Sequence, residues 1–141
     1  MGRLLAIDYG TKRTGIAVSD SLQIIANGLT TVRTHTIFDF LKKYFEEEDV
    51  DCVIVGLPKT MNNEYSENMK HIRPFVNKLQ TTYPNLKIEY YDERFTSSLA
   101  QKAMLDSGLK KKDRQNKALV DEISATIILQ DYMESLILQN R

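Results

Sequence analysis

Three acidic residues stand at the ends of predicted elements that lie far apart in the sequence. Asp8 follows the apolar run 3–7, Glu93 closely follows the run 87–91, and Asp121 lies near the start of a long helical pattern. In open α/β sheets, functional side chains gather at the carboxyl ends of strands, so the first two could meet at one edge. The final helix can supply the third. These three acids are our candidate catalytic residues.

Carboxylates brought this close together repel one another unless a cation or a proton neutralises them. Oxygen ligands without histidine or thiolate favour Mg²⁺ or Mn²⁺, and such an ion polarises a phosphate oxygen and activates a water for attack. Ser124 and Ala125 are small and share a helix face with Asp121, which lets that helix approach the sheet closely. His35 and His71 have no matching metal partners, and we assign them no role.

Each acid taken singly could instead be a helix cap or a solvated surface residue. The prediction of a metal site, with Asp8, Glu93 and Asp121 as its ligands, therefore depends on the whole set.

Basic residues flank the same segments and could hold the phosphates of a nucleic-acid backbone. Lys12 and Arg13 lie in the turn after Asp8, and Arg94 follows Glu93 directly. The polar segment 108–117 adds a basic cluster. The candidate nucleic-acid-binding residues are Lys12, Arg13, Arg94, Lys111, Lys112 and Arg114. By composition alone, the cluster could equally be a solvated loop.

The predicted strands alternate with helices after an initial hairpin. The strands are expected at residues 3–7, 14–18, 29–34, 52–58 and 87–91. Gly10 and Gly15 permit a tight turn between the first two. The run 52–58 is apolar on both faces, as in a central strand covered by helices on both sides. This order predicts an α/β sandwich with a mixed sheet.

Helical spacing of apolar residues predicts the remaining elements. Thr36 is the expected N-cap of an amphipathic helix, and a second helix covers about 69–79, where Pro74 should introduce a kink or a restart. Thr96 could cap a helix running to about Leu105. A long, largely buried helix covers 119–138, and residues 59–67 read as an exposed loop.

Composition limits the class of protein. The 141 residues are 42% hydrophobic, which predicts one domain spanning 1–141 with a real core. The 19 basic and 19 acidic residues cancel, so any nucleic-acid surface must be local. Cys52 has no cysteine partner and is expected as a small buried hydrophobe. We find neither a membrane span nor a signal peptide and expect a cytoplasmic protein.

The assembled motifs resemble those of the YqgF/RuvX family, whose members are described as pre-16S rRNA nucleases and as Holliday junction resolvases. The matching segments are IDYGTKRTGIAVSD (7–20), VIVGLP (53–58), DERFTS (92–97) and VDEISATIILQ (120–130). DYGTKRTGIAVSD together with DERFTS is a specific pairing. The glycine that the family usually has after VIVGLP is missing, since Asn62 and Asn63 occupy that loop.

The resemblance implies a ribonuclease H-like fold, a mixed β-sheet of about five strands flanked by helices. It places Asp8, Glu93 and Asp121 on the acidic active-site positions, with Arg13 and Arg94 facing phosphate. The implied function is a metal-dependent nuclease, using Mg²⁺ or Mn²⁺, that trims the 5′ end of pre-16S rRNA during ribosome biogenesis in the cytoplasm.

Three other functions compete with this interpretation. A Holliday junction resolvase would need two sites related by a dimer axis, and the sequence displays no dimer interface, so we expect a monomer or a weak homodimer. A catalytically silent RNA-binding ribosome-assembly factor would not need the acids. A sugar-kinase or actin-like ATPase has a similar first loop but needs a second such domain, which 141 residues do not supply.

Overall fold

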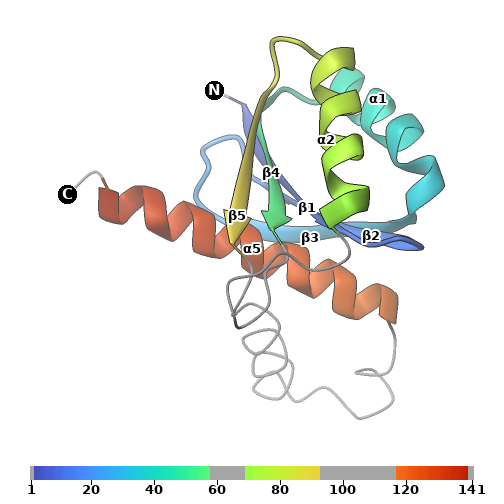
Figure 1. Cartoon of the computed structure of the whole chain (residues 1–141). Coiled ribbons are helices and arrows are strands. Elements are labelled where there is room, and N and C mark those ends of the chain that lie inside the picture. The colour runs from blue at the N-terminus through green and yellow to red at the C-terminus, as the bar shows by residue number, and fades with distance from the viewer. Residues whose placement is uncertain (1, 58–68, 93–116, 140–141) are drawn as a thin grey trace.

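The computed structural model describes residues 2–57, 69–92 and 117–139 and contains a mixed five-stranded sheet (Figure 1). The strands are β1 (Arg3–Tyr9), β2 (Arg13–Ser19), β3 (Ala26–Arg33), β4 (Val50–Leu57) and β5 (Lys87–Asp92). Their spatial order is β3-β2-β1-β4-β5. The pairs β1·β2 and β2·β3 are antiparallel, whereas β1·β4 and β4·β5 are parallel. The carboxyl ends of β1, β4 and β5 therefore share one edge.

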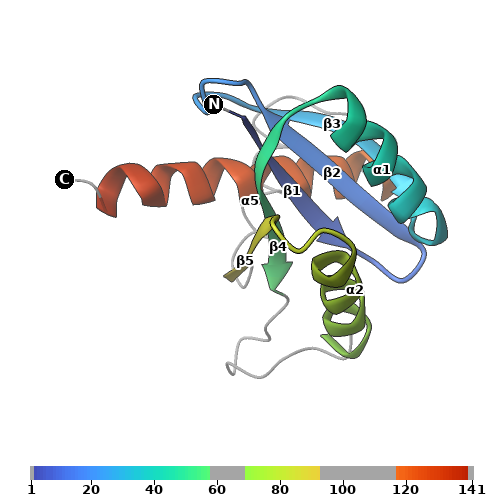
Figure 2. The ribbon, with the colours of Figure 1, turned by 90° about the horizontal axis from the view of Figure 1, so that it is seen from above.

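Helices cover both faces of this sheet (Figures 1 and 2). The helical elements are the 3₁₀ turn η1 (Thr34–Thr36), α1 (Ile37–Glu47), α2 (Met69–Thr82) and α5 (Lys117–Gln139). Helices α1 and α2 pack on one face, and α5 crosses the other face under β3, β2 and β1. The prediction of an α/β sandwich with a mixed sheet is confirmed.

The alternation of side chains along each strand divides the core into two layers. On β1, Leu5 and Ile7 point into the layer under α1 and α2, while Leu4 and Ala6 point into the layer under α5. All four are buried. Because both faces are covered, the strands read as continuous apolar runs, as the sequence of β4 indicated.

Several predicted boundaries differ from the observed ones. β3 starts earlier than expected, at Ala26. Thr36 precedes α1, but its hydroxyl donates to the Arg33 carbonyl rather than capping the helix. α2 runs through Pro74 as one helix, so the alternative of a restart is wrong. Pro74 is exposed, so the missing N–H of this proline lies on the solvent side of the helix.

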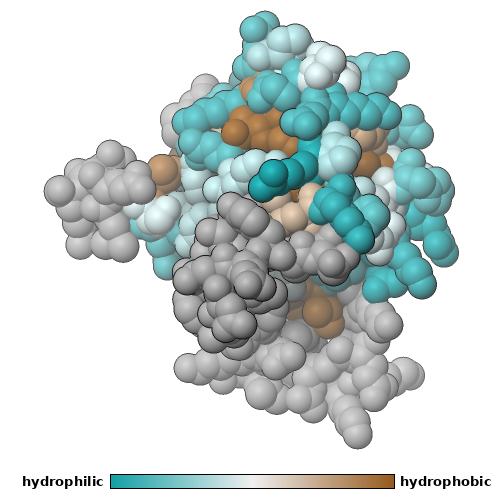
Figure 3. Space-filling model, viewed as in Figure 1, coloured by the Kyte–Doolittle hydropathy of each residue, from teal (hydrophilic) through white to brown (hydrophobic). Residues whose placement is uncertain are grey.

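The surface seen from the side of Figure 1 is mostly hydrophilic over α1 and α2, with hydrophobic side chains showing only in patches (Figure 3). This matches the helices' amphipathic sequences, whose apolar residues are turned towards the sheet. Within the described ranges, every helix is too short or too polar to cross a membrane.

Candidate active site

Asp8 lies inside β1 rather than after it, which corrects the predicted end of this strand. It is the sixth residue of β1 and pairs with Gly15 of β2. Since Leu4 and Ala6 face α5, alternation places the Asp8 side chain on the same face. Asp8 is partly exposed, near the carboxyl end of the strand. The hairpin extends further than the apolar run because Tyr9 and Thr14 still pair.

Gly15 allows α5 to touch the sheet beside Asp8. A Cβ atom at Gly15 would overlap the backbone carbonyl of Asp121, so only glycine fits at this crossing. The sequence pattern predicts a turn residue here, but Gly15 is a strand residue whose missing side chain admits the helix. One turn further along α5, Ala125 is fully buried and continues the close contact. Asp8 and Asp121 thus lie next to the same glycine.

Arg13 completes this group on the α5 face. Its Nε atom lies 3.2 Å from Oδ2 of Asp121. The Arg13 side chain is 37% exposed and that of Asp121 is 25% exposed, so both groups remain accessible to a ligand. The predicted neighbourhood of Asp8, Arg13 and Asp121 is therefore observed.

The turn between β1 and β2 is tied to the end of β3. The Thr34 N–H donates to the Lys12 carbonyl over 3.0 Å, and the Thr34 hydroxyl donates to the Gly10 carbonyl over 2.6 Å. Thr34 Oγ1 also lies 2.8 Å from Oγ1 of Thr14, with both threonines buried. This turn, which carries Lys12 and Arg13, is consequently held by the neighbouring strand.

The remaining site predictions lie outside the described residues. They are Glu93, Arg94, Lys111, Lys112 and Arg114, together with the helix predicted from Thr96 to Leu105 and the loop 59–67. The structure describes β5 up to Asp92, which pairs with Leu57.

A polar contact on the α5 face fastens the far part of the helix to β5. The Tyr132 hydroxyl donates to a carboxylate oxygen of Glu89, and the Tyr132 ring meets Tyr91 edge to face.

Cys52 is buried in the same layer, as predicted. Burial, followed by the nearby Glu89 charge, raises the pKa of the Cys52 thiol to about 11. This thiol is a packing residue rather than a reactive one.

The carboxylates of this group have the chemistry of hard-metal ligands. Within residues 2–57, 69–92 and 117–139, no three histidine, cysteine, aspartate or glutamate side chains lie together as a metal site. Asp8 and Asp121 are oxygen donors of the kind that Mg²⁺ and Mn²⁺ bind, so their chemistry fits such an ion. A complete ligand set would need an acid from outside these ranges.

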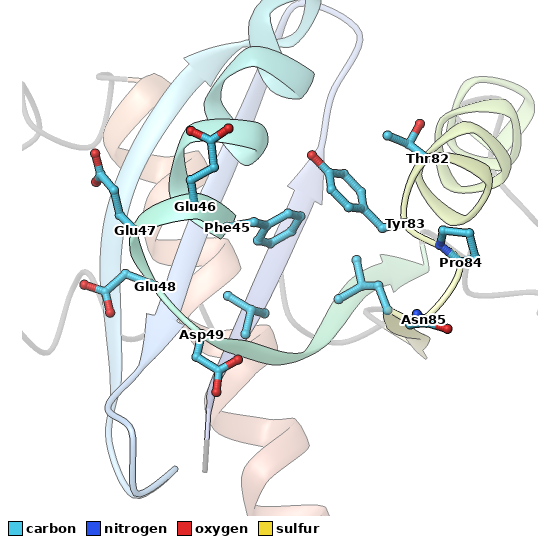
Figure 4. A pocket seen from close by; sticks show the side chains of 11 residues that line it. Phe45, Glu46, Glu47, Glu48, Asp49, Thr82, Tyr83, Pro84 and Asn85 are labelled. Carbon is cyan, nitrogen blue, oxygen red and sulfur yellow. The ribbon is translucent and has the colours of Figure 1, made fainter.

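A large hollow of about 610 Å³ lies away from this group (Figure 4). It is lined by residues 45–50 and 82–86, at the edge where β4 and β5 begin. Phe45 and Tyr83, two of its lining residues, pack edge to face with ring centroids 5.0 Å apart. Since sites in such sheets form at the carboxyl ends of strands, we do not assign the active site here.

Comparison with known proteins identifies the family of this chain. A family model described as "RuvX: Holliday junction resolvase" matches residues 2–135. The chain belongs to the RuvX family. The resemblance seen in the four sequence motifs is thus confirmed.

Relatives of this RuvX family member are similar over nearly their whole length. A Bacteroides fragilis protein is 67% identical over 135 residues, covering 96% of this chain and 98% of the relative. A Phocaeicola vulgatus protein is 69% identical over 135 residues, with 96% and 97% covered. Both carry the name "Putative pre-16S rRNA nuclease".

Solved structures confirm the fold of this RuvX family member. Thermus thermophilus RuvC in complex with a Holliday junction substrate superposes with a TM-score of 0.57 at 15% identity, covering 96% of each chain. A second T. thermophilus RuvC structure gives 0.53 at 13% identity, covering 94% and 96%. The predicted ribonuclease H-like fold is correct, although such low identity says nothing about substrate.

Proposed function

We propose that this RuvX family member is a metal-dependent nuclease that processes the 5′ end of pre-16S rRNA in the cytoplasm. The observation that carries the proposal is the placement of Asp8 and Asp121 beside Gly15, where α5 crosses the sheet. The names of its relatives supply the substrate. The RNase H-like fold agrees with phosphodiester hydrolysis.

Asp8 and Asp121 would hold Mg²⁺ or Mn²⁺, with Glu93 as the third ligand. Tyr91 of β5 packs against Tyr132 of α5, and Glu93 is the second residue after Tyr91 in the sequence. Bound ions of this kind polarise a phosphate oxygen and lower the pKa of an attacking water. The protein's own contribution is to hold Asp8 and Asp121 near one another, through the close contact of α5 with Gly15.

Arg13 has a defined part in this arrangement. Its guanidinium is paired with Asp121 and partly exposed, so it can turn one of its remaining N–H groups to a phosphate oxygen. Lys12 is exposed in the same turn, which Thr34 fixes in place. These two residues would position the backbone of the RNA over the carboxylates, and Arg94, Lys111, Lys112 and Arg114 would extend that contact.

Resolution of Holliday junctions is the second candidate, because the matching family model and the RuvC complex both name that substrate. Symmetric cutting of two strands needs a dimer. A monomeric protein that cuts precursor RNA would favour the first function. A solution dimer that cuts four-way DNA junctions as efficiently would favour the second.

The test compares wild type with Asp8→Asn on precursor rRNA and on a four-way DNA junction, each with Mn²⁺ and with EDTA. We expect wild type to shorten the RNA only with the metal, and Asp8→Asn to be inactive while remaining folded. Asp39→Asn, an exposed acid on α1, is the matched control and should cut normally. RNA cleavage that survives Asp8→Asn would falsify the assignment and leave a binding factor as the alternative.

A further inference from the structure

A basic pocket lies beside the candidate active site, where the β1–β2 turn meets the end of β3. Its volume is about 430 Å³. The residues that line it are Thr11, Lys12, Arg13, Thr31, Val32, Arg33 and His35. Among the described residues that line it, three carry a positive charge and none is a carboxylate. We call this group the turn pocket.

Of the cationic residues in the turn pocket, Arg33 is the one that the sequence motifs did not single out. It pairs with Arg13 across β2 and β3, so the two guanidinium groups project from the same face of the sheet. Like charges directly opposite one another on neighbouring strands repel. Arg13 is offset by Asp121, whereas no carboxylate in the described part of the chain pairs with the exposed Arg33. A bound anion would relieve the repulsion.

The backbone around the turn pocket is held before any ligand binds. Thr34, directly after Arg33, bonds to the carbonyls of Gly10 and Lys12, and it is buried against Thr14. The cations are therefore presented by two segments fastened together, which reduces the ordering cost of binding. Exposed hydroxyl and imidazole groups of Thr11 and His35 add further polar partners.

The location of the pocket relates it to the carboxylates. Gly15, beside which Asp8 and Asp121 lie, pairs with Thr31, and Arg33 is two residues further along β3. The Cα atom of Arg33 is thus two strands away from that of Asp8 across the sheet and two residues further along the strand direction. The two Cα atoms are therefore about 12 Å apart. The rise along a duplex axis is about 3.4 Å per nucleotide and the backbone winds around that axis, so this distance corresponds to no more than a few nucleotides of one strand.

We propose that the turn pocket binds a backbone phosphate of the nucleic-acid substrate, with Arg33 as its main cation, a few nucleotides away from the phosphate that is cut. The inference rests on the proposed nuclease function and adds a positioning contact to it. Arg13, which lines the pocket and also pairs with Asp121, connects the bound strand to the carboxylates. Because the ligand is a phosphate, the contact would not distinguish bases.

Binding without cleavage tests the proposal. The full-length protein would be titrated, in EDTA, into fluorescently labelled single-stranded RNA and DNA of one sequence, and anisotropy recorded at several salt concentrations. We expect Arg33→Ala to weaken both complexes by about three- to tenfold and to reduce the slope of log K against log salt by about one. Arg33→Lys should recover part of the affinity, because the charge is retained.

Lys43→Ala is the matched control, since it removes one exposed positive charge from α1, away from the turn pocket. It should bind as wild type does. Equal binding by Arg33→Ala and wild type, or equal losses in Arg33→Ala and Lys43→Ala, would overturn the proposal. A loss on RNA alone would also overturn it, because a phosphate contact is common to both nucleic acids.

A separate reaction with Mn²⁺ distinguishes this proposal from the nuclease function. If wild type cuts RNA but Arg33→Ala binds normally, only the phosphate contact is wrong. If wild type cuts nothing while Arg33→Ala still loses affinity and salt dependence, the nuclease function fails and the phosphate contact stands.

Discussion

Arg13 and Asp121 are 108 positions apart in the sequence, and the Arg13 Nε atom lies 3.2 Å from Oδ2 of Asp121. This ion pair joins the start of β2 to the first turns of α5. It also joins the two candidate sites, because Arg13 lines the turn pocket and Asp121 stands beside Asp8 at Gly15. The turn pocket and the carboxylates are therefore physically connected through one side chain.

The first prediction concerns the contact between Gly15 and α5. Gly15→Ala should lower the free energy of unfolding by about 1–3 kcal/mol, because the new methyl group overlaps backbone rather than a movable side chain. It should also reduce cleavage by displacing Asp121. Urea unfolding and a cleavage assay measure the two effects.

Gly28→Ala is the control for this substitution. Its methyl group would meet only the Glu122 side chain, which can move away, so a smaller loss of stability is expected. A Gly15→Ala protein that is as stable as wild type would show that α5 does not depend on this glycine.

The second prediction concerns Asp121 as a metal ligand. Asp121→Asn should reduce cleavage by about a hundredfold or more, because an amide oxygen binds Mn²⁺ more weakly than a carboxylate does. Calorimetric titration with Mn²⁺ should show weaker binding. Normal Mn²⁺ affinity together with lost cleavage would instead assign Asp121 to positioning Arg13.

The third prediction concerns Arg13. Arg13→Ala should weaken RNA binding in EDTA by about three- to tenfold, as expected for loss of a phosphate contact. Stability should change by less than about 1 kcal/mol, since the pair with Asp121 is partly exposed and screened by solvent. Anisotropy and urea unfolding provide the two values, and a large loss of stability with unchanged RNA binding would make Arg13 a structural residue.

The fourth prediction concerns alkaline pH. The Cys52 thiol has its pKa raised from 9.0 to about 11 in the folded protein, so the unfolded chain releases this proton first as pH rises. The contribution of this thiol to the free energy of unfolding should be fully present below about pH 9. It should fall by about 2–3 kcal/mol between pH 9 and 11. Urea unfolding across this range measures the loss.

Cys52→Ala removes this thiol and should make the loss of stability between pH 9 and 11 smaller than in wild type. The loss should not vanish, because the tyrosines whose pKa values are raised, Tyr9, Tyr44, Tyr90 and Tyr132, still titrate. The variant should be less stable at neutral pH by about 1 kcal/mol, because a small cavity replaces the buried sulfur. An unchanged slope between wild type and Cys52→Ala would exclude the thiol as the source.

Local patterns in the sequence were sufficient to predict most elements of the fold. Apolar runs bounded by glycine and proline indicated the strands, and helical spacing indicated α1, α2 and α5. These signals are short-range, since each is the spacing of apolar residues within one segment of the chain. The errors concern ends, such as Asp8 inside β1, because pairing with β2 continues where the apolar residues stop.

The sequence by itself also predicted that Asp8 and Asp121 lie close together, since carboxylates at element ends suggested a shared edge and the resemblance to the family implied the same positions. Only the tertiary structure decided how they meet. The sequence predicts Gly15 as a turn residue, whereas the structure shows that α5 crosses the sheet at this glycine. Arg33 lies in no motif, and only the register of β2 and β3 places it opposite Arg13. A close backbone approach and a cross-strand pairing are relations between distant segments, which local periodicity does not encode.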